Sequence, residues 1–175
     1  LPIFYGSNNE VIWKTAVPTD SLKREALYQR FRSRFANDPV PYAQLCVPRM
    51  REVLQACRAL GLKTGLASAG PRWVIDGFLE QLKLASAFDA TLSGEDCAAN
   101  KPAPDIYLAA MRRLGVSPCR TLVVEDSPLG IRAAHEAGAT VCAVMPPSAP
   151  ELDQSLADVR LGPLAALLDW LPSAL

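Results

Sequence analysis

Several residues with reactive side chains follow apolar segments of this chain. A β-branched run leads directly to Glu125 and Asp126, an earlier apolar segment ends at Ser68 and Ala69, and Lys101 opens a proline-rich turn. A hydroxyl beside free backbone N–H groups can bind an anion, and an ammonium group can neutralise phosphoryl oxygens. Two carboxylates can hold a hard cation such as Mg²⁺. Taken together, these residue types predict a site for a phosphate and a magnesium ion.

Each of these features also has a purely structural interpretation. Acids near a helix N-terminus are favoured by the helix dipole, and Ser127 followed by Pro128 suits a helix start. Ser68 could simply cap a helix, and most lysines such as Lys101 are exposed loop residues. Both interpretations stay open for each residue alone, and only the combination favours the phosphate site.

The elements that must position these groups alternate after residue 48. Strands are predicted at five segments: 63–68, 88–93, 121–125, 140–145 and, more weakly, 159–161. Helices are predicted at 48–60, 72–84, 104–114, 128–137 and 163–171. This alternation predicts βαβ units with a parallel sheet between helices. Because ligands bind outside the carboxyl ends of parallel strands, residues at the strand exits are the candidates for chemistry.

The first part of the chain has a different pattern. Residues 19–21 offer a helix cap, and the helix that follows has an apolar side (Leu22, Ala26, Leu27, Phe31 and Phe35) opposite a strongly basic side. We expect the basic side to be solvated, in preference to an anion site. Residues 37–48 contain three prolines and are expected to connect this helical piece to the α/β part.

Bulk composition excludes several classes of protein. The 175 residues are 50% hydrophobic, enough for one core and a small appendage, and Lys plus Arg equals Asp plus Glu at 18 each. A nucleic-acid role is therefore disfavoured. The five cysteines form no C-x-x-C pair, which indicates reduced thiols, and no run is long enough to cross a bilayer. We expect a cytoplasmic monomer with no membrane partner.

Three motifs, in order, resemble those of a known family. LASAG at 66–70, KPAPDIYLAAMRRLGV at 101–116 and VVEDSPLGIRAAHEAGA at 123–139 are similar to the second, third and fourth motifs of the haloacid dehalogenase (HAD) superfamily, in its β-phosphoglucomutase-like branch. The resemblance runs from about Phe4 to Val144. It implies an α/β, HAD-like Rossmannoid fold of three layers (α/β/α) around a parallel sheet, with a helical cap.

The resemblance also implies roles for individual residues. Ser68 and the Ala69 amide would bind phosphate, and Lys101 would steady the phosphoryl group and the nucleophile. Asp126 with Glu125 would hold Mg²⁺, so the expected catalytic residues are Ser68, Lys101 and Asp126.

The first part of the chain is expected to serve as the cap. Residues 1–47 would be a partial helical cap over an α/β core of residues 48–175. Residues 5–13 resemble the substrate-facing loop of the cap, so Gly6, Ser7, Asn8 and Asn9 are expected to contact substrate.

The chain departs from the family in one respect. Family members begin with a strand that ends in D-x-D-G and carries the nucleophile, and this sequence contains no such motif. None of Asp20, Asp76, Asp89, Asp96 and Asp105 is placed to substitute. We therefore expect a longer protein whose first strand lies between the strands ending at Ser68 and Glu125. An intact mass of 18.9 kDa would contradict this.

The implied activity is that of a Mg²⁺-dependent phosphatase acting on a small organic phosphate, such as a sugar phosphate, through an aspartyl-phosphate intermediate. A sugar-phosphate mutase and a noncatalytic phosphate-binding or regulatory protein are the alternatives. Asn8 and Asn9 stand where mutase relatives tend to carry a basic residue, which favours a hydrolase. His135 is expected to be structural or at the surface and not catalytic, and the three tryptophans are expected to be packing groups.

Overall fold

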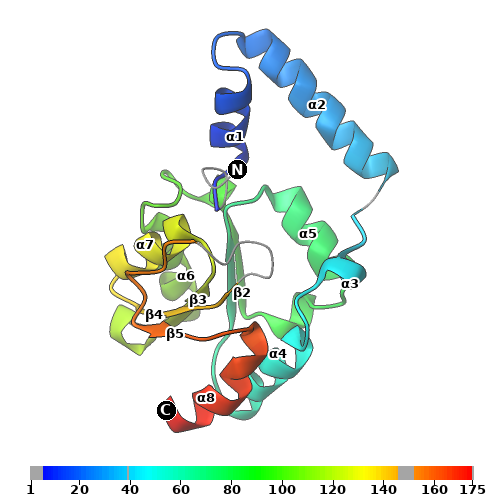
Figure 1. Ribbon diagram of the computed structural model, residues 1–175. Helices are drawn as coiled ribbons and strands as arrows, with labels where there is room; N and C mark the ends of the chain where they lie inside the picture. The colour runs from blue at the N-terminus through cyan, green and yellow to red at the C-terminus, as the bar shows by residue number, and fades with distance from the viewer. Residues whose placement is uncertain (1–5, 39, 146–151, 175) are drawn as a thin grey trace.

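We describe residues 6–38, 40–145 and 152–174 of a computed structural model of the chain (Figure 1). The helices are α1 (Asn9–Ala16), α2 (Ser21–Asn37), α3 (Tyr42–Leu45), α4 (Met50–Ala59), α5 (Arg72–Gln81), α6 (Asp105–Leu114), α7 (Pro128–Glu136) and α8 (Leu167–Ala174). The strands are β1 (Gly65–Ser68), β2 (Ala90–Ser93), β3 (Leu122–Glu125), β4 (Thr140–Ala143) and β5 (Val159–Arg160).

All strand pairs are parallel, as predicted. β1 pairs with β2, with Ser68 opposite Ser93, and β3 pairs with β4, with Glu125 opposite Ala143. β5 joins the other edge of β4. Within the described residues β1 and β3 share no ladder, so the strands form two sheets, β1-β2 and β3-β4-β5.

Helices cover both faces of the strands, because alternate side chains of a strand point to opposite faces. Val141 and Ala143 of β4 pack in the core under α6 and α7, whereas Cys142 between them packs with α4 and α8. Leu66 of β1 packs against the residues of α5, and Ala67 packs on the side of α6. The predicted three-layer α/β/α arrangement is therefore confirmed.

Local signals explain where the key helices begin and end. Ser127 caps α7 by accepting a hydrogen bond from the Gly130 amide at 3.0 Å, and Pro128 takes the first helical position, which needs no N–H donor. Gly115 ends α6 at φ 67°, in the left-handed region that glycine tolerates. Asp20 caps α2 through the Lys23 amide at 2.8 Å, as the sequence predicted.

The first part of the chain is more helical than expected. Residues 9–13, predicted as part of a loop, belong to α1, because the Asn8 side chain accepts the Val11 amide at 2.8 Å and starts the helix one residue later. The connector at 37–48 contains the short helix α3. The strand predicted at 140–145 ends at Ala143, and residues 146–150 lie outside the described part of the chain.

Helix α2 projects from the α/β part (Figure 1), and only some side chains of its predicted apolar side are partly buried. Leu27, Phe31 and Phe35 are half-buried. Leu22 on the same apolar side is 84% exposed, because the first turn of α2 lies far from the α/β part. The basic residues Lys23, Arg30, Arg32 and Arg34 are exposed, which confirms the solvated basic side.

An aromatic cluster joins α1 and α2 to the α/β part. Trp73 of α5 makes edge contacts with Phe31 and Phe35 of α2, at centroid distances of 6.4 and 5.6 Å. Trp13 of α1 reaches Phe31 at 5.8 Å. The first two tryptophans are therefore packing groups, as expected, and Trp170 packs in the core between α4 and α8.

Two further expectations concern the whole chain. All five cysteines are free, which agrees with the prediction of reduced thiols. None of the helices within the described ranges is long and apolar enough to span a membrane.

Candidate active site

Lys101 and Glu125 form a buried ion pair where β1 and β3 end. Their side chains are 6% and 10% exposed, and the Lys101 ammonium donates to the Glu125 carboxylate. The same ammonium donates to the Ala67 carbonyl of β1 at 3.3 Å. It also lies 4.8 Å from the centre of the Tyr107 ring. Lys101 thus links the carboxyl end of one sheet to that of the other.

Hydrogen bonds saturate the Glu125 carboxylate. Its Oε1 accepts from Lys101 and from the Tyr107 hydroxyl. Its Oε2 accepts from the Asp126 amide at 3.1 Å, the Ser127 amide at 3.2 Å and the Ser127 hydroxyl at 3.0 Å. A carboxylate has about four lone-pair positions, so Glu125 has little capacity left for a further ligand.

These contacts fix the protonation states of the cluster. Burial raises the pKa of the Glu125 carboxyl, but the charge of Lys101 and the hydrogen bonds from Lys101, Tyr107 and Ser127 outweigh it and leave the pKa below its usual value. Burial, followed by the charge and hydrogen bond of Glu125, raises the pKa of the Tyr107 hydroxyl. At neutral pH Glu125 is therefore an anion and Tyr107 a neutral donor.

Gly130 makes room for this carboxylate. A Cβ atom at Gly130 would lie 2.1 Å from Cδ of Glu125 and 2.2 and 2.3 Å from its two oxygens, far inside van der Waals contact. The first turn of α7 therefore packs directly on the Glu125 carboxylate. Glycine is needed at this position because a larger residue would overlap the Glu125 carboxylate, and not because the helix requires it.

Ser68 and Ala69 lie at the exit of β1, as predicted. The Ser68 hydroxyl accepts the Gly70 amide at 3.1 Å, and the Ser93 hydroxyl donates to the Gly70 carbonyl at 2.8 Å, which holds the turn against β2. Ser68 therefore stabilises the turn after β1, as the structural interpretation of this residue predicted. Because a hydroxyl is also a donor, its proton stays available for a bound anion.

Asp126 follows Glu125 and is half-buried. Its amide donates to Glu125, and its carbonyl accepts from Gln154 at 3.4 Å. Its charge contributes to raising the Tyr107 pKa. Asp126 thus lies at the same end of β3 as the Lys101–Glu125 pair.

The carboxylates of Glu125 and Asp126 at the end of β3 are oxygen donors of the kind that a hard cation prefers. Within the described residues no group of three or more His, Cys, Asp or Glu side chains could hold a metal ion. Mg²⁺ is commonly bound through one or two carboxylates together with waters and substrate phosphate, so one carboxylate beside a phosphate site is compatible with it. Since both Glu125 oxygens are engaged, Glu125 fits better as a group that orients its neighbours.

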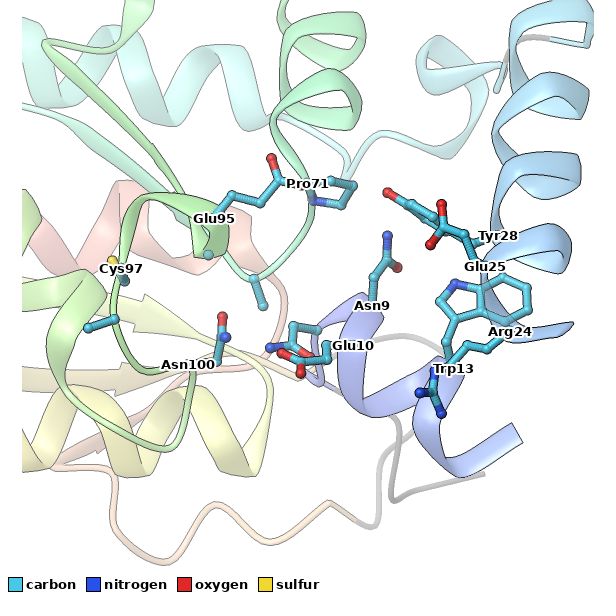
Figure 2. Close-up of a pocket in the computed structure, with 14 residues that line it drawn as sticks. Asn9, Glu10, Trp13, Arg24, Glu25, Tyr28, Pro71, Glu95, Cys97 and Asn100 are labelled. Carbon is cyan, nitrogen blue, oxygen red and sulfur yellow. The ribbon is translucent and has the colours of Figure 1, made fainter. Parts of the chain in front are cut away.

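A cavity of about 440 Å³ lies between the first two helices and the loops that follow β1 and β2 (Figure 2). Ala69, Pro71, Gly94, Glu95 and Asn100 line it from the α/β part. Asn8, Asn9, Glu10, Trp13, Arg24, Glu25 and Tyr28 line it from α1 and α2. Two of the four expected substrate residues, Asn8 and Asn9, are therefore at this cavity.

The other two expected substrate residues are placed differently. Neither Gly6 nor Ser7 lines the cavity. Gly6, at φ +78°, packs so closely on Ser127 that a Cβ would lie 2.5 Å from the Ser127 hydroxyl oxygen. Gly6 therefore brings the start of the described chain against the Glu125 cluster.

Tyr107 and most of the cavity residues of α1 and α2 were not predicted from the sequence as part of the site. Tyr107 belongs to the KPAPDIY motif and lies in the first turn of α6, close in sequence to Lys101. This closeness to Lys101 could have indicated that Tyr107 belongs to the site. The cavity residues of α1 and α2 gave no comparable signal, because their contact with residues 69–100 depends on the docking of helices distant in the sequence.

Comparisons with known proteins show the family of this chain. The haloacid dehalogenase-like hydrolase family matches residues 3–144, and the chain belongs to that family. Hexitol phosphatase B of Escherichia coli is 32% identical over 157 residues, which cover 89% of this chain and 70% of that enzyme. The phosphorylated carbohydrates phosphatase of Thermotoga maritima is 36% identical over 91 residues, 52% of this chain and 42% of that protein.

A solved structure shows the same fold. A hydrolase from Pseudomonas syringae aligns with a TM-score of 0.78 at 20% identity, over 97% of this chain and 80% of that one. The chain is thus a HAD-like hydrolase, as its three motifs implied.

Proposed function

We propose that this protein is a Mg²⁺-dependent phosphatase of small, sugar-like phosphate esters that acts through an aspartyl-phosphate intermediate. The observation that carries the proposal is the Lys101–Glu125 pair, which joins the ends of β1 and β3 beside Ser68 and Asp126. The relatives named for hexitol phosphates and phosphorylated carbohydrates support this substrate class.

Each residue has a proposed part in binding the phosphoryl group. The Ser68 hydroxyl and the Ala69 amide donate to phosphoryl oxygens at the exit of β1. The Lys101 ammonium neutralises charge that develops during transfer, and Glu125 with Tyr107 holds that ammonium in place. Asp126 holds Mg²⁺, which supplies further charge neutralisation when bound.

We propose that the nucleophilic aspartate comes from a strand outside these 175 residues. β1 and β3 are unpaired with one another in the described part of the chain, while Lys101 contacts the ends of both. The projection of α2 from the α/β part supports the division into a partial cap at residues 1–47 and an α/β core at 48–175 (Figure 1). The free thiols support a cytoplasmic location, and we propose a monomer.

Hydrolysis of an aryl phosphate by the full-length protein, with Mg²⁺ or with a chelator, tests the proposal. We expect turnover only with Mg²⁺. Asp126→Asn should raise the Mg²⁺ concentration for half-maximal activity by roughly tenfold or more. Glu136→Gln is the matched control, because Glu136 is an exposed carboxylate at the end of α7. It should leave the Mg²⁺ dependence unchanged.

Three results would contradict the proposal. Turnover that persists in chelator, or an Asp126→Asn variant with unaltered Mg²⁺ dependence, would remove the assigned role of Asp126. Phosphate-dependent thermal stabilisation without turnover of any ester would favour the noncatalytic phosphate-binding protein.

A further inference from the structure

The cavity beside the phosphate site has an unusual balance of charges. Three carboxylates line it, from Glu10, Glu25 and Glu95, against one guanidinium, from Arg24. The Cys97 thiol adds no charge at neutral pH, because burial and then the charges of Asp105 and Asp96 raise its pKa. The walls that would surround the organic part of a phosphate ester are therefore formally anionic.

The single guanidinium compensates only part of this charge: Lys14 first, and Arg24 to a smaller degree, lower the pKa of the Glu10 carboxyl. Nη1 of Arg24 donates to the Val17 carbonyl at 2.8 Å, at the end of α1. Figure 2 shows the Arg24 side chain turned away from the space between Asn9 and Pro71. A second anionic group on a ligand would therefore meet three carboxylates and one guanidinium that already has a carbonyl partner.

The three carboxylates differ in their neighbours. Glu10 pairs with Lys14 at 2.6 Å, in an exposed salt bridge that solvent screens, and Glu95 accepts the Arg72 amide at the start of α5 at 3.0 Å. Glu25 accepts only a neutral donor, Gln29, at 2.7 Å, and forms no salt bridge within the described ranges. Glu25 is thus the least compensated negative charge on the wall.

One polar atom of the cavity lining lacks a partner. The Asn9 amide nitrogen is buried and has no hydrogen-bond partner among the described residues. In Figure 2 this amide points between Pro71 and Tyr28. A buried donor left unpaired costs about 1–3 kcal/mol, so the position favours a ligand that brings an acceptor oxygen.

We infer that this cavity selects phosphate esters whose organic part is a neutral, polyhydroxylated chain or ring, and rejects those with a second phosphate or a carboxylate. Hydroxyl groups suit both the carboxylates and the Asn9 amide of the cavity, since a hydroxyl can donate a hydrogen bond to a carboxylate and accept one from an amide. The rings of Trp13 and Tyr28 supply an apolar surface for the carbon skeleton. Repulsion from Glu25 disfavours a second anion. This inference rests on the proposed phosphatase function, and it assigns Glu25 and Asn9 as specificity-determining residues.

The test compares three phosphate esters with the full-length protein: glucitol 6-phosphate, 2-phosphoglycolate and a ketose 1,5-bisphosphate. Thermal shift measures their binding without any need for turnover, and kcat/KM is measured alongside. We expect glucitol 6-phosphate to be preferred over both competitors, each of which carries a second anionic group, by roughly tenfold or more in each measurement.

Two variants test the assigned residues. Glu25→Lys should change the ratio of kcat/KM for the bisphosphate to that for glucitol 6-phosphate by about tenfold in favour of the bisphosphate. Asn9→Ala should reduce the preference for glucitol 6-phosphate over an aryl phosphate by about fivefold. Glu136→Lys makes the same charge change outside the cavity, and it should leave all ratios unaltered.

The outcomes separate this inference from the proposed function. If an aryl phosphate is hydrolysed but 2-phosphoglycolate or the bisphosphate is preferred, the inference is wrong and the phosphatase function stands. If no ester is hydrolysed, the phosphatase function is wrong, and the thermal-shift ranking still decides the inference. Equal ratios in Glu25→Lys and Glu136→Lys would remove Glu25 as the source of selectivity.

Discussion

Replacement of Gly130 by alanine should destabilise the protein, although alanine is the better helix former. The helix itself would gain about 1 kcal/mol from this change. The new Cβ would lie 2.1 Å from Cδ of Glu125, so the carboxylate or the first turn of α7 must move. That movement disturbs the hydrogen bonds from Lys101, Tyr107 and Ser127.

The size of the effect follows from these opposing terms. Overpacking of a buried site costs about 1–3 kcal/mol, and each weakened hydrogen bond to a charged group costs about 1.5–3 kcal/mol. After subtraction of the helix gain, we expect a net loss of about 3 kcal/mol. For a chain of this length that corresponds to a fall in melting temperature of about 6–12 °C.

Gly77 provides the matched control. It lies inside α5, and a Cβ there would be 4.0 Å from the nearest atom, on the Tyr42 ring. Gly77→Ala should therefore raise the melting temperature by about 2–4 °C. Differential scanning calorimetry of both variants makes the comparison. A Gly130→Ala protein that melts at or above the wild-type temperature would refute the proposed packing of α7 on Glu125.

Three further outcomes are expected. The pKa of Glu125 is lower in the folded protein than its unfolded value of about 4.5. The ionised carboxylate therefore stabilises the fold above pH 4.5, and this stabilisation is lost as the pH falls through the folded-state pKa. Glu125→Gln should therefore be less stable than wild type at pH 7, by calorimetry, with a difference that shrinks below pH 4.5. Among the cysteines, Cys119 is exposed and Cys142 is buried with a pKa raised by burial to about 11, so a thiol reagent should modify Cys119 first and Cys142 last, by mass spectrometry. Trp73→Ala removes two ring contacts to α2, each worth about 1 kcal/mol, and should speed proteolysis within α2 more than within the α/β core.

Each of these expectations can be contradicted directly. An acid-unfolding curve of Glu125→Gln parallel to that of wild type would mean that Lys101 does not hold the Glu125 carboxylate ionised. Early modification of Cys142 would contradict its burial, and unchanged cleavage of α2 in Trp73→Ala would mean that other contacts dock the helix. Phe78→Ala, at an aromatic contact of α5 with Tyr42 and not with α2, is a suitable control for the last experiment.

The α/β part was largely predictable from the sequence because its signals are local. Short apolar runs bounded by glycine and proline located all five strands, and the stops at Gly115 and Gly138 follow the ends of α6 and α7. Strand exits in turn located Ser68, Lys101 and Asp126. The parallel pairing then placed these residues at one end of the strands, as expected for such folds.

The first part of the chain was less predictable because its structure depends on packing between distant segments. Leu22 fits an apolar periodicity, but its side chain is 84% exposed in the described part of the chain. Residues 9–13 resembled a loop, whereas the Asn8 cap starts a helix there. The requirement for glycine at position 130 is likewise invisible in the sequence, because it arises from a carboxylate five residues earlier that folds back onto the helix.

The buried ion pair restricts which substitutions of Lys101 evolution can accept. A neutral residue at position 101 would leave the Glu125 anion buried and unpaired, at a cost of about 3–5 kcal/mol, which is a large part of the stability of an ordinary domain. A descendant that no longer catalysed any reaction would still be selected to keep this lysine for folding. The presence of Lys101 in a relative therefore reports an intact scaffold. Asp126, which we propose as the Mg²⁺ ligand and whose side chain is not part of that buried pair, would be the better marker of retained activity.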